Sequence, residues 1–276
     1  MSRSAMSARL LLVCLLVPAF CFCALAADGA GEPLSVFVVH CEPTNATEPM
    51  FLQLVDLVAL ANEFAIPLTI DFTAQWAEMI LEDESKIAAV SAWMETGHEI
   101  GAHHHAYWAT LERSANWDGY TNTPVSDLLP IYQDRFLGTM EDYMALLDAL
   151  PGERVTACMG QDDERDMEDW PASLSYSTTG NFLEDCVSEP TLVSFPSGDA
   201  WHVSHGLILQ TPGALTALYE ATAPDRVFGV VGHVYNFRDE PRAFEVWFRY
   251  LSVNDPSGAR RRTVASAIEE WLEDDG

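Results

Sequence analysis

The most informative stretch of the sequence is Gly97-His98-Glu99-Ile100-Gly101-Ala102-His103-His104-His105. In it, three consecutive histidines follow directly on a short strand-like run. Polar residues at the junction between a strand and a loop often carry function. Neutral imidazole is available near neutral pH, and it is the commonest protein ligand for borderline metal ions. The stretch therefore predicts a metal or catalytic site. An exposed polar turn is the alternative, whereas an expression tag does not fit a short internal run within a patterned segment.

Two further apolar runs precede this stretch. Ser35 to Val39 is continuously apolar and ends in His40-Cys41-Glu42-Pro43, and Leu68 to Phe72 forms the second run. The segments Phe51–Phe64 and Gln75–Met94, which lie between the runs, have helical patterns. An alternation of strand and helix at this spacing predicts an α/β fold whose parallel strands deliver polar residues at their carboxyl ends.

The rest of the chain is less regular. Asp127–Leu150 is expected to form a helix and Val155–Met159 a strand that leads into the acidic segment Gln161–Asp169. The other expected elements are short strands at Leu174–Ser177, Thr191–Phe195 and Leu207–Gln210, a helix at Pro212–Thr222, a strand at Val227–Val231 that ends in Gly232-His233, and closing helices at Phe244–Val253 and Val264–Leu272. There is no internal repeat or linker, so residues 27–276 are expected to form one domain.

The first 26 residues read as a secretory signal peptide. Arg3 and Arg9 supply the positive start, Leu10–Cys23 forms the apolar stretch, and Ala24-Leu25-Ala26 fits a cleavage site before Ala27. The apolar stretch is shorter than the roughly 20 residues of a membrane-spanning helix. We therefore expect a secreted protein, extracellular or periplasmic, with no membrane insertion after cleavage; an uncleaved N-terminal anchor is the alternative.

Charge and cysteine content narrow the function classes. The chain has 42 acidic and 14 basic residues, with Lys86 as its single lysine, and loss of Arg3 and Arg9 would leave a formal net charge of −30. Such a surface disfavours nucleic acid and anionic lipid as partners, and it suits a salt-adapted source or simply an acidic secreted protein. Cleavage would leave Cys41, Cys158 and Cys186, of which Cys158 and Cys186 could form one disulfide.

The segment Gly97–His103 resembles the polysaccharide deacetylase family, carbohydrate esterase family 4. Members of that family carry Gly-His-Glu-Ile-Gly-Asn-His on the third strand of a distorted (β/α)7 barrel. Leu68–Thr73 is similar to the second strand, and the position of His40-Cys41-Glu42-Pro43 matches the first motif, so the resemblance covers roughly residues 34–108. It implies a single-domain, TIM-like (β/α)7 barrel and a metal-dependent hydrolase that removes N- or O-acyl groups from a carbohydrate or cleaves another C–N amide bond.

The resemblance also assigns roles, and the chain departs from some of them. The last histidine of the family motif, a metal ligand, maps onto His103, and a histidine that acts as general acid maps onto His233. The paired aspartates of the first motif, a general base and a metal ligand, become Cys41 and Glu42. The second histidine of the family falls on Tyr107, and no arginine matches the third motif.

The geometry of extended segments predicts which of the residues present can form a site together. Residues two apart in an extended segment point the same way, so His40 pairs with Glu42, and His103 with His105. We expect Glu42, His103 and His105 to hold a divalent metal ion, most simply zinc, in an open site that leaves room for water. His40 is a candidate general base or metal ligand, with a buried, hydrogen-bonded structural histidine as its alternative. His104 is expected to face away, toward a carboxylate.

Candidate substrate contacts and competing functions complete the sequence-based hypothesis. Tyr107, Trp117 and Asp118 are expected to bind a carbohydrate or an acylated small molecule. The alternative is a catalytically inactive extracellular protein that kept the barrel and binds carbohydrate or metal. Glycosidic-bond cleavage would need two carboxylates, and Glu42 with Asp71 is the nominated pair. His202 and His205 belong to no motif.

Overall fold

The structure is a computed structural model that describes residues 31–108, 116–159, 167–209 and 212–274. The expected signal peptide and its cleavage site therefore lie outside the described residues, as does most of the acidic segment Gln161–Asp169. No helix within the described ranges is long and apolar enough to cross a membrane.

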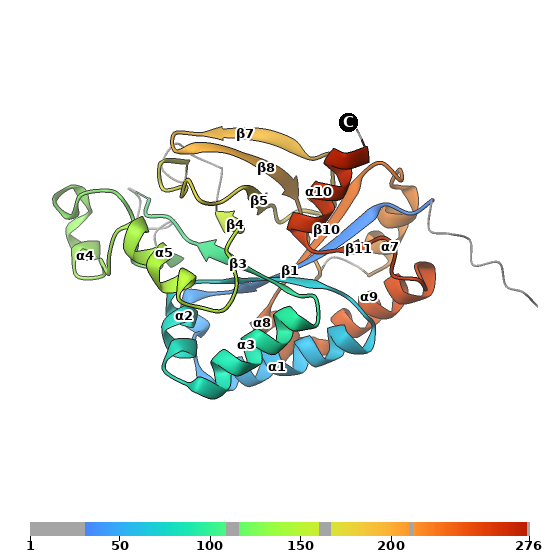
Figure 1. The fold of residues 1–276 in the computed structure, drawn as a ribbon, viewed down its shortest axis with the longest axis horizontal. Coiled ribbons are helices and arrows are strands. Elements are labelled where there is room, and N and C mark those ends of the chain that lie inside the picture. Colours follow the sequence, from blue (N-terminus) through green and yellow to red (C-terminus); the bar gives the residue numbers. More distant parts are fainter. Residues whose placement is uncertain (1–30, 109–115, 160–166, 210–211, 275–276) are drawn as a thin grey trace, which may run out of the picture.

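A strongly curled, mostly parallel sheet forms the centre of the molecule, as expected for a distorted α/β barrel (Figure 1). Its strands run in the order β6-β10-β1-β2-β3-β4-β5-β8-β7, with β9 beside β10 and β11 beside β1. The strands are β1 (Leu34–Cys41), β2 (Leu68–Phe72), β3 (Glu99–His104), β4 (Thr156–Met159), β5 (Tyr176–Thr179), β6 (Val187–Ser188), β7 (Thr191–Phe195), β8 (Gly198–Ser204), β9 (Gly206–Leu207), β10 (Val227–His233) and β11 (Arg261–Arg262).

The stretch Gly198–Leu207 brings the two ends of the curled sheet together. Its first part, β8, pairs in parallel with β5, whereas its last part, β9, pairs in parallel with β10. The peptide N–H of Ile208 also donates to the carbonyl of Val231, at 2.8 Å. Among the described residues, seven parallel strand positions thus surround one interior, which agrees with the (β/α)7 expectation.

Helices cover the outside of this sheet. They are α1 (Glu48–Glu63), α2 (Ala74–Leu81), α3 (Glu84–Glu95), α4 (Pro130–Gln133), α5 (Met140–Asp148), α7 (Pro212–Ala221), α8 (Val234–Asp239), α9 (Pro241–Asn254) and α10 (Val264–Asp274), with the short 3-10 turns η1 (Pro43–Asn45), η3 (Val125–Asp127) and η4 (Leu183–Cys186). In Figure 1, α1, α3, α8 and α9 lie on one side of the sheet, and the β7–β8 hairpin lies on the other.

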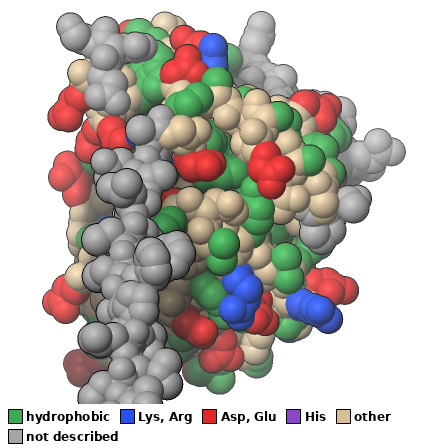
Figure 2. Space-filling view, turned by 90° about the vertical axis from the view of Figure 1, so that its right-hand side faces the viewer, with side chains coloured by type: hydrophobic (Ala, Val, Ile, Leu, Met, Phe, Trp, Pro, Cys, Tyr) green, Lys and Arg blue, Asp and Glu red, His purple; other side chains and the backbone are tan. Residues whose placement is uncertain are grey.

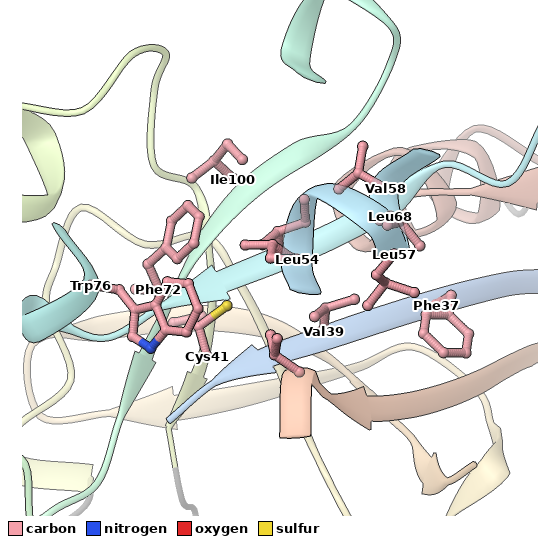
Figure 3. Packing of buried hydrophobic residues seen from close by; sticks show 14 of the residues in the cluster. Phe37, Val39, Cys41, Leu54, Leu57, Val58, Leu68, Phe72, Trp76 and Ile100 are labelled. Atoms are coloured by element: carbon pink, nitrogen blue, oxygen red, sulfur yellow. The ribbon is translucent and has the colours of Figure 1, made fainter. Parts of the chain in front are cut away.

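Strand β1 shows why the sheet is buried on both faces. All eight of its residues are buried, as its continuous apolar sequence predicted. Phe37, Val39 and Cys41 belong to the core that β1 shares with α1, including Leu54 and Leu57 (Figure 3). The alternating residues face the interior of the barrel instead, because neighbouring side chains of a strand point to opposite sides.

The interior has an apolar floor. Val36 and Val38 of β1 pack there with Val203 of β8 and Val231 of β10, and α10 closes this end with Val264, Ala267 and Ile268. The next inward position on each of these three strands is two residues further along the chain. Those positions are His40, His205 and His233, so the apolar layer passes directly into a layer of imidazoles.

Several sequence-based boundaries were wrong in the second half of the chain. The single helix expected at Asp127–Leu150 is broken into η3, α4 and α5, because Pro130 starts one piece and a loop through Gly138 separates it from the next. Strand β8 and helix α8 were not predicted. Strand β8 escaped because its alternating sequence Gly-Asp-Ala-Trp-His-Val-Ser lacks an apolar run.

The surface matches the acidic composition. On the face in Figure 2, red acidic side chains are scattered widely, whereas blue basic side chains occupy a few places. The single lysine, Lys86, is itself paired with Glu48 at 2.7 Å and Asp83 at 2.8 Å.

Candidate metal centre

The candidate site lies at the carboxyl ends of the barrel strands. Strand β1 delivers His40 and, just past its end, Glu42, whereas β3 delivers His103 and the loop after it His105. Strand β10 ends at His233, which is the register partner of His40. Active sites of parallel barrels form at this end because the loops that leave the strands converge there.

Three imidazoles surround one carboxylate. Glu42 Oε1 lies 3.4 Å from His103 Nε2 and 3.2 Å from His233 Nε2. The other oxygen, Glu42 Oε2, lies 2.8 Å from His105 Nε2. The expected convergence of the first strand end with the triple-histidine segment is therefore present.

His40 packs against this group. Its ring stacks on the ring of His103 with centroids 4.1 Å apart, and it meets the ring of His233 edge-on at 5.2 Å. Potential ligand atoms of His40, Glu42 and His103 lie within 4.8 Å of one another, which is close enough for one ion. His40 is thus a ligand candidate, which is one of the two roles that the sequence left open for it.

Hydrogen bonds fix which ring nitrogens face the carboxylate. His103 Nδ1 lies 3.2 Å from the Cys158 carbonyl, and His233 Nδ1 lies 2.9 Å from Asn236 Oδ1. A carbonyl oxygen can only accept, and Asn236 Oδ1 also accepts from the His233 peptide N–H, so both rings carry their proton on Nδ1. In the neutral form of either ring, the Nε2 lone pair consequently points at Glu42.

This arrangement calls for a cation. The Nε2 lone pair of a neutral imidazole and the oxygens of Glu42 are all acceptors, and acceptors at about 3 Å repel unless a proton or a metal ion lies between them. In addition, His40 Nε2 is buried without a hydrogen-bond partner. Nitrogen and carboxylate donors of this kind suit zinc and similar divalent ions.

The charge state of the residues agrees with ligand roles. Burial raises the pKa of Glu42, but the close approach of the His103, His105 and His233 rings outweighs it and holds that pKa well below its usual range. Burial lowers the pKa of His40 and of His103, so both rings favour the neutral form that binds metal.

We call His40, Glu42, His103, His105 and His233 the histidine–glutamate cluster. His104 faces away from this cluster, as its place between two inward residues predicted. Its Nδ1 lies 2.7 Å from Asp118 Oδ2, and its Nε2 lies 3.7 Å from Asp169 Oδ2. Burial lowers the pKa of His104, but the two carboxylates raise it overall to about 10. The charged ring therefore anchors the loop that carries His105.

A cavity of about 510 Å³ opens onto the histidines. Its lining includes His40, Glu42, His103, His105 and His233 together with Trp108, Cys158, Asn181, Phe182, Asp185 and His202. Phe182 is 66% exposed, so its ring is available to a ligand. The cavity is large enough for a sugar unit and reaches every residue of the histidine–glutamate cluster.

The three residues expected to bind substrate lie elsewhere. Tyr107, Trp117 and Asp118 are 1%, 2% and 2% exposed, and none of them lines this cavity. Tyr107 and Trp117 pack together, with the Tyr107 hydroxyl accepting from the Leu129 peptide N–H at 2.8 Å. Packing and the bond to His104 bury these side chains away from this cavity, so their contact with a substrate stays a prediction.

Two other expectations fail for reasons of burial and direction. None of Cys41, Cys158 and Cys186 is in a disulfide; Cys158 faces His205, whereas Cys186 packs against Gly206. Asp71 is 0% exposed, and neither of its oxygens has a hydrogen-bond partner. It cannot flank a sugar bond in the cavity together with Glu42, so the glycosidic pair is not supported.

The sequence missed His205 and Cys158 as members of the site. His205 follows β8, and its ring lies edge-on to His40 with centroids 5.2 Å apart. Cys158 is the register partner of His103, and its Sγ lies 3.9 Å from His205 Nε2. A correct prediction of β8 would have revealed His205, because it stands two residues after the inward-facing Val203.

No protein-family model and no curated protein matches the chain. Solved structures do match. A "putative polysaccharide deacetylase" from Mycobacterium smegmatis aligns with a TM-score of 0.53 at 12% identity, over 88% of this chain and 92% of that one.

The chain has a polysaccharide deacetylase-like fold. A 4-alpha-glucanotransferase from Thermococcus litoralis also aligns, with a TM-score of 0.52 at 11% identity, over 86% of this chain but 38% of that one. At such low identity these matches support the deacetylase-like fold alone. The function must therefore be inferred from the residues of the site.

Proposed function

We propose that the protein is a secreted, metal-dependent hydrolase that removes N- or O-acyl groups from a carbohydrate. The observation that carries the proposal is the convergence of His103, His105 and His233 on Glu42, at the cavity end of a deacetylase-like barrel. Glu42, His103 and His105 would hold the ion, with His40 beside them. The acidic surface and the N-terminal signal pattern support a carbohydrate rather than a nucleic acid as the partner, and an extracellular or periplasmic location.

The residues around the cavity have distinct tasks in this reaction. When bound, a divalent ion supplies Lewis acidity that polarises a carbonyl group and makes hydroxide available near neutral pH. His233 is held by Asn236 with Nε2 toward the site, where in its protonated form it would donate a proton to the departing amine or alcohol. Trp108 and Phe182 line the cavity and offer apolar faces to a sugar ring.

The proposal is tested by metal content and turnover of the purified protein. We expect about one or more zinc ions per chain and release of acetate from N-acetylated glucosamine oligosaccharides or from p-nitrophenyl acetate. His103→Ala should reduce kcat/KM on the order of 100-fold or more, because it removes a metal ligand. His98→Gln is the matched control, since His98 is buried at the opposite end of β3 and should leave turnover within a few-fold.

The second candidate is a binding protein without catalysis. It is favoured by the exposed Phe182 at the cavity and by the absence of the paired aspartates and of the arginine expected from the family resemblance. Sugar binding that a chelator does not change, together with no acetate release by the zinc-loaded protein, would establish this alternative and exclude the hydrolase.

A further inference from the structure

A second group of potential ligands lies beside the first. Ligand atoms of His40, Cys158 and His205 are within 4.8 Å of one another, as are those of His40, Glu42 and His103. The two groups share His40, but Cys158 and His205 play no part in the proposed hydrolysis. They come from β4 and from the turn between β8 and β9.

The second group is fully buried, like the first. His205 is 0% exposed, His40 is 5% exposed and Cys158 is 7% exposed. His40 Nε2 and His205 Nδ1 both lack hydrogen-bond partners, although buried polar atoms are almost always satisfied. Each ring therefore has a nitrogen whose burial is unexplained by hydrogen bonding.

The contact between Cys158 and His205 is weak as a hydrogen bond. The sulfur lies 3.9 Å from His205 Nε2, close to the outer limit for a contact of this type. Tetrahedral zinc, by contrast, places sulfur at about 2.3 Å and imidazole nitrogen at about 2.0 Å from the ion, so its ligands lie roughly 3.5 Å apart. The separation of the two atoms is near that spacing.

We propose that Cys158, His205 and His40 form a thiolate–imidazole binding site for a soft or borderline divalent cation, zinc or cobalt. On binding, the Cys158 thiol releases its proton to solvent as the sulfur–metal bond forms, and no electron is transferred. Cys158 and His40 both line the cavity, which gives the ion a path of entry. The inference is independent of hydrolysis, because it concerns ligation only.

Ligation by sulfur gives the proposal a direct spectroscopic test. The purified protein loaded with Co²⁺ should show a near-ultraviolet thiolate-to-cobalt charge-transfer absorption. Cys158→Ser and His205→Ala should abolish or strongly reduce it. Cys186→Ser is the matched control, because Cys186 is equally buried but packs in η4 against Gly206, and it should keep the absorption.

X-ray absorption at the zinc edge of the unmutated protein provides a second measurement, which does not depend on a variant folding. A sulfur neighbour at about 2.3 Å supports the proposal, whereas a shell of nitrogen and oxygen alone overturns it. Equal charge-transfer absorption in wild type and a folded Cys158→Ser variant also overturns it. Turnover without sulfur ligation would leave the hydrolase standing and remove the thiolate site, and sulfur ligation without turnover would do the reverse.

Discussion

At the scale of single residues, Glu42 gathers the site because its two oxygens meet nitrogens from three different segments. A carboxylate with imidazole nitrogens close to both of its oxygens places several potential ligands around one point, where a cation can bind them together. Gly101 in β3 is a second residue whose type is set by its surroundings, because they leave no space for a side chain. A Cβ at this position would overlap Asp71 Oδ1 and approach the Thr156 carbonyl to 3.0 Å.

Gly101→Ala is therefore expected to lower the free energy of unfolding by about 1–3 kcal/mol, because Asp71 is buried and has no space to move into. Urea unfolding measures this change. In an Asp71→Ala background the smaller side chain leaves room for the new methyl group, so the cost of Gly101→Ala should fall by at least roughly 1 kcal/mol. Equal costs in both backgrounds would contradict the proposed overlap.

At the scale of elements, the loop after β3 depends on Asp118. This carboxylate accepts from His104 Nδ1 at 2.7 Å, from the His105 peptide N–H at 3.2 Å and from the Tyr120 peptide N–H at 3.1 Å. Asp118 thus holds the segment that directs His105 toward Glu42, although Asp118 itself contacts neither Glu42 nor the cavity.

Asp118→Ala is expected to weaken zinc binding about 10–100-fold, since partners that orient metal ligands typically contribute this much. Competition with a chromophoric chelator measures the affinity. Asp134→Ala removes an exposed carboxylate of the same region and should leave the affinity unchanged. An unchanged affinity in a folded Asp118→Ala variant would show that His105 is not a ligand or needs no such support.

At the scale of the whole molecule, the barrel stacks an imidazole layer on an apolar layer, and its outer core buries further histidines. His98 accepts from the Leu68 peptide N–H through Nδ1 at 3.0 Å, and its Nε2 lies 3.1 Å from Asn62 Oδ1. Burial lowers the pKa of His98 to about 4. The unfolded chain, with a histidine pKa near 6.5, therefore binds more protons than the folded chain between about pH 6.5 and 4.

Because of this difference, His98 is expected to lower the free energy of unfolding by up to about 3 kcal/mol as the pH falls through that window. Asp71 and Glu99, whose pKa values burial raises, act in the opposite direction, so the comparison must be made with a variant. His98→Gln should lose about 3 kcal/mol less stability than wild type between pH 7 and 4, as measured by urea unfolding. Parallel pH profiles would contradict the role of His98.

How much was predictable depended on how far apart the partners lie in the chain. The elements β1, β2 and β3, with α1 between the first two, followed from apolar runs and helical spacing. So did the pairing of His40 with Glu42 and of His103 with His105, because strand periodicity is a local property. The single helix expected at Gln75–Met94 is instead broken into α2 and α3, because Asp83 caps the start of α3. The second half was harder, since β8 alternates without an apolar run and its inward residues gain meaning only beside β10.

The α/β class, the acidic surface and the polar residues and histidines at strand ends could be predicted from the sequence. Composition needs no structure, and the periodicity of strands and helices is a property of a few consecutive residues. The tertiary structure alone decided that Tyr107, Trp117 and Asp118 are buried, that Cys158 faces His205 and that His233 meets Glu42. Those outcomes depend on sheet register and on the curl that brings β9 to β10, and no local pattern specifies contacts between segments so distant along the chain.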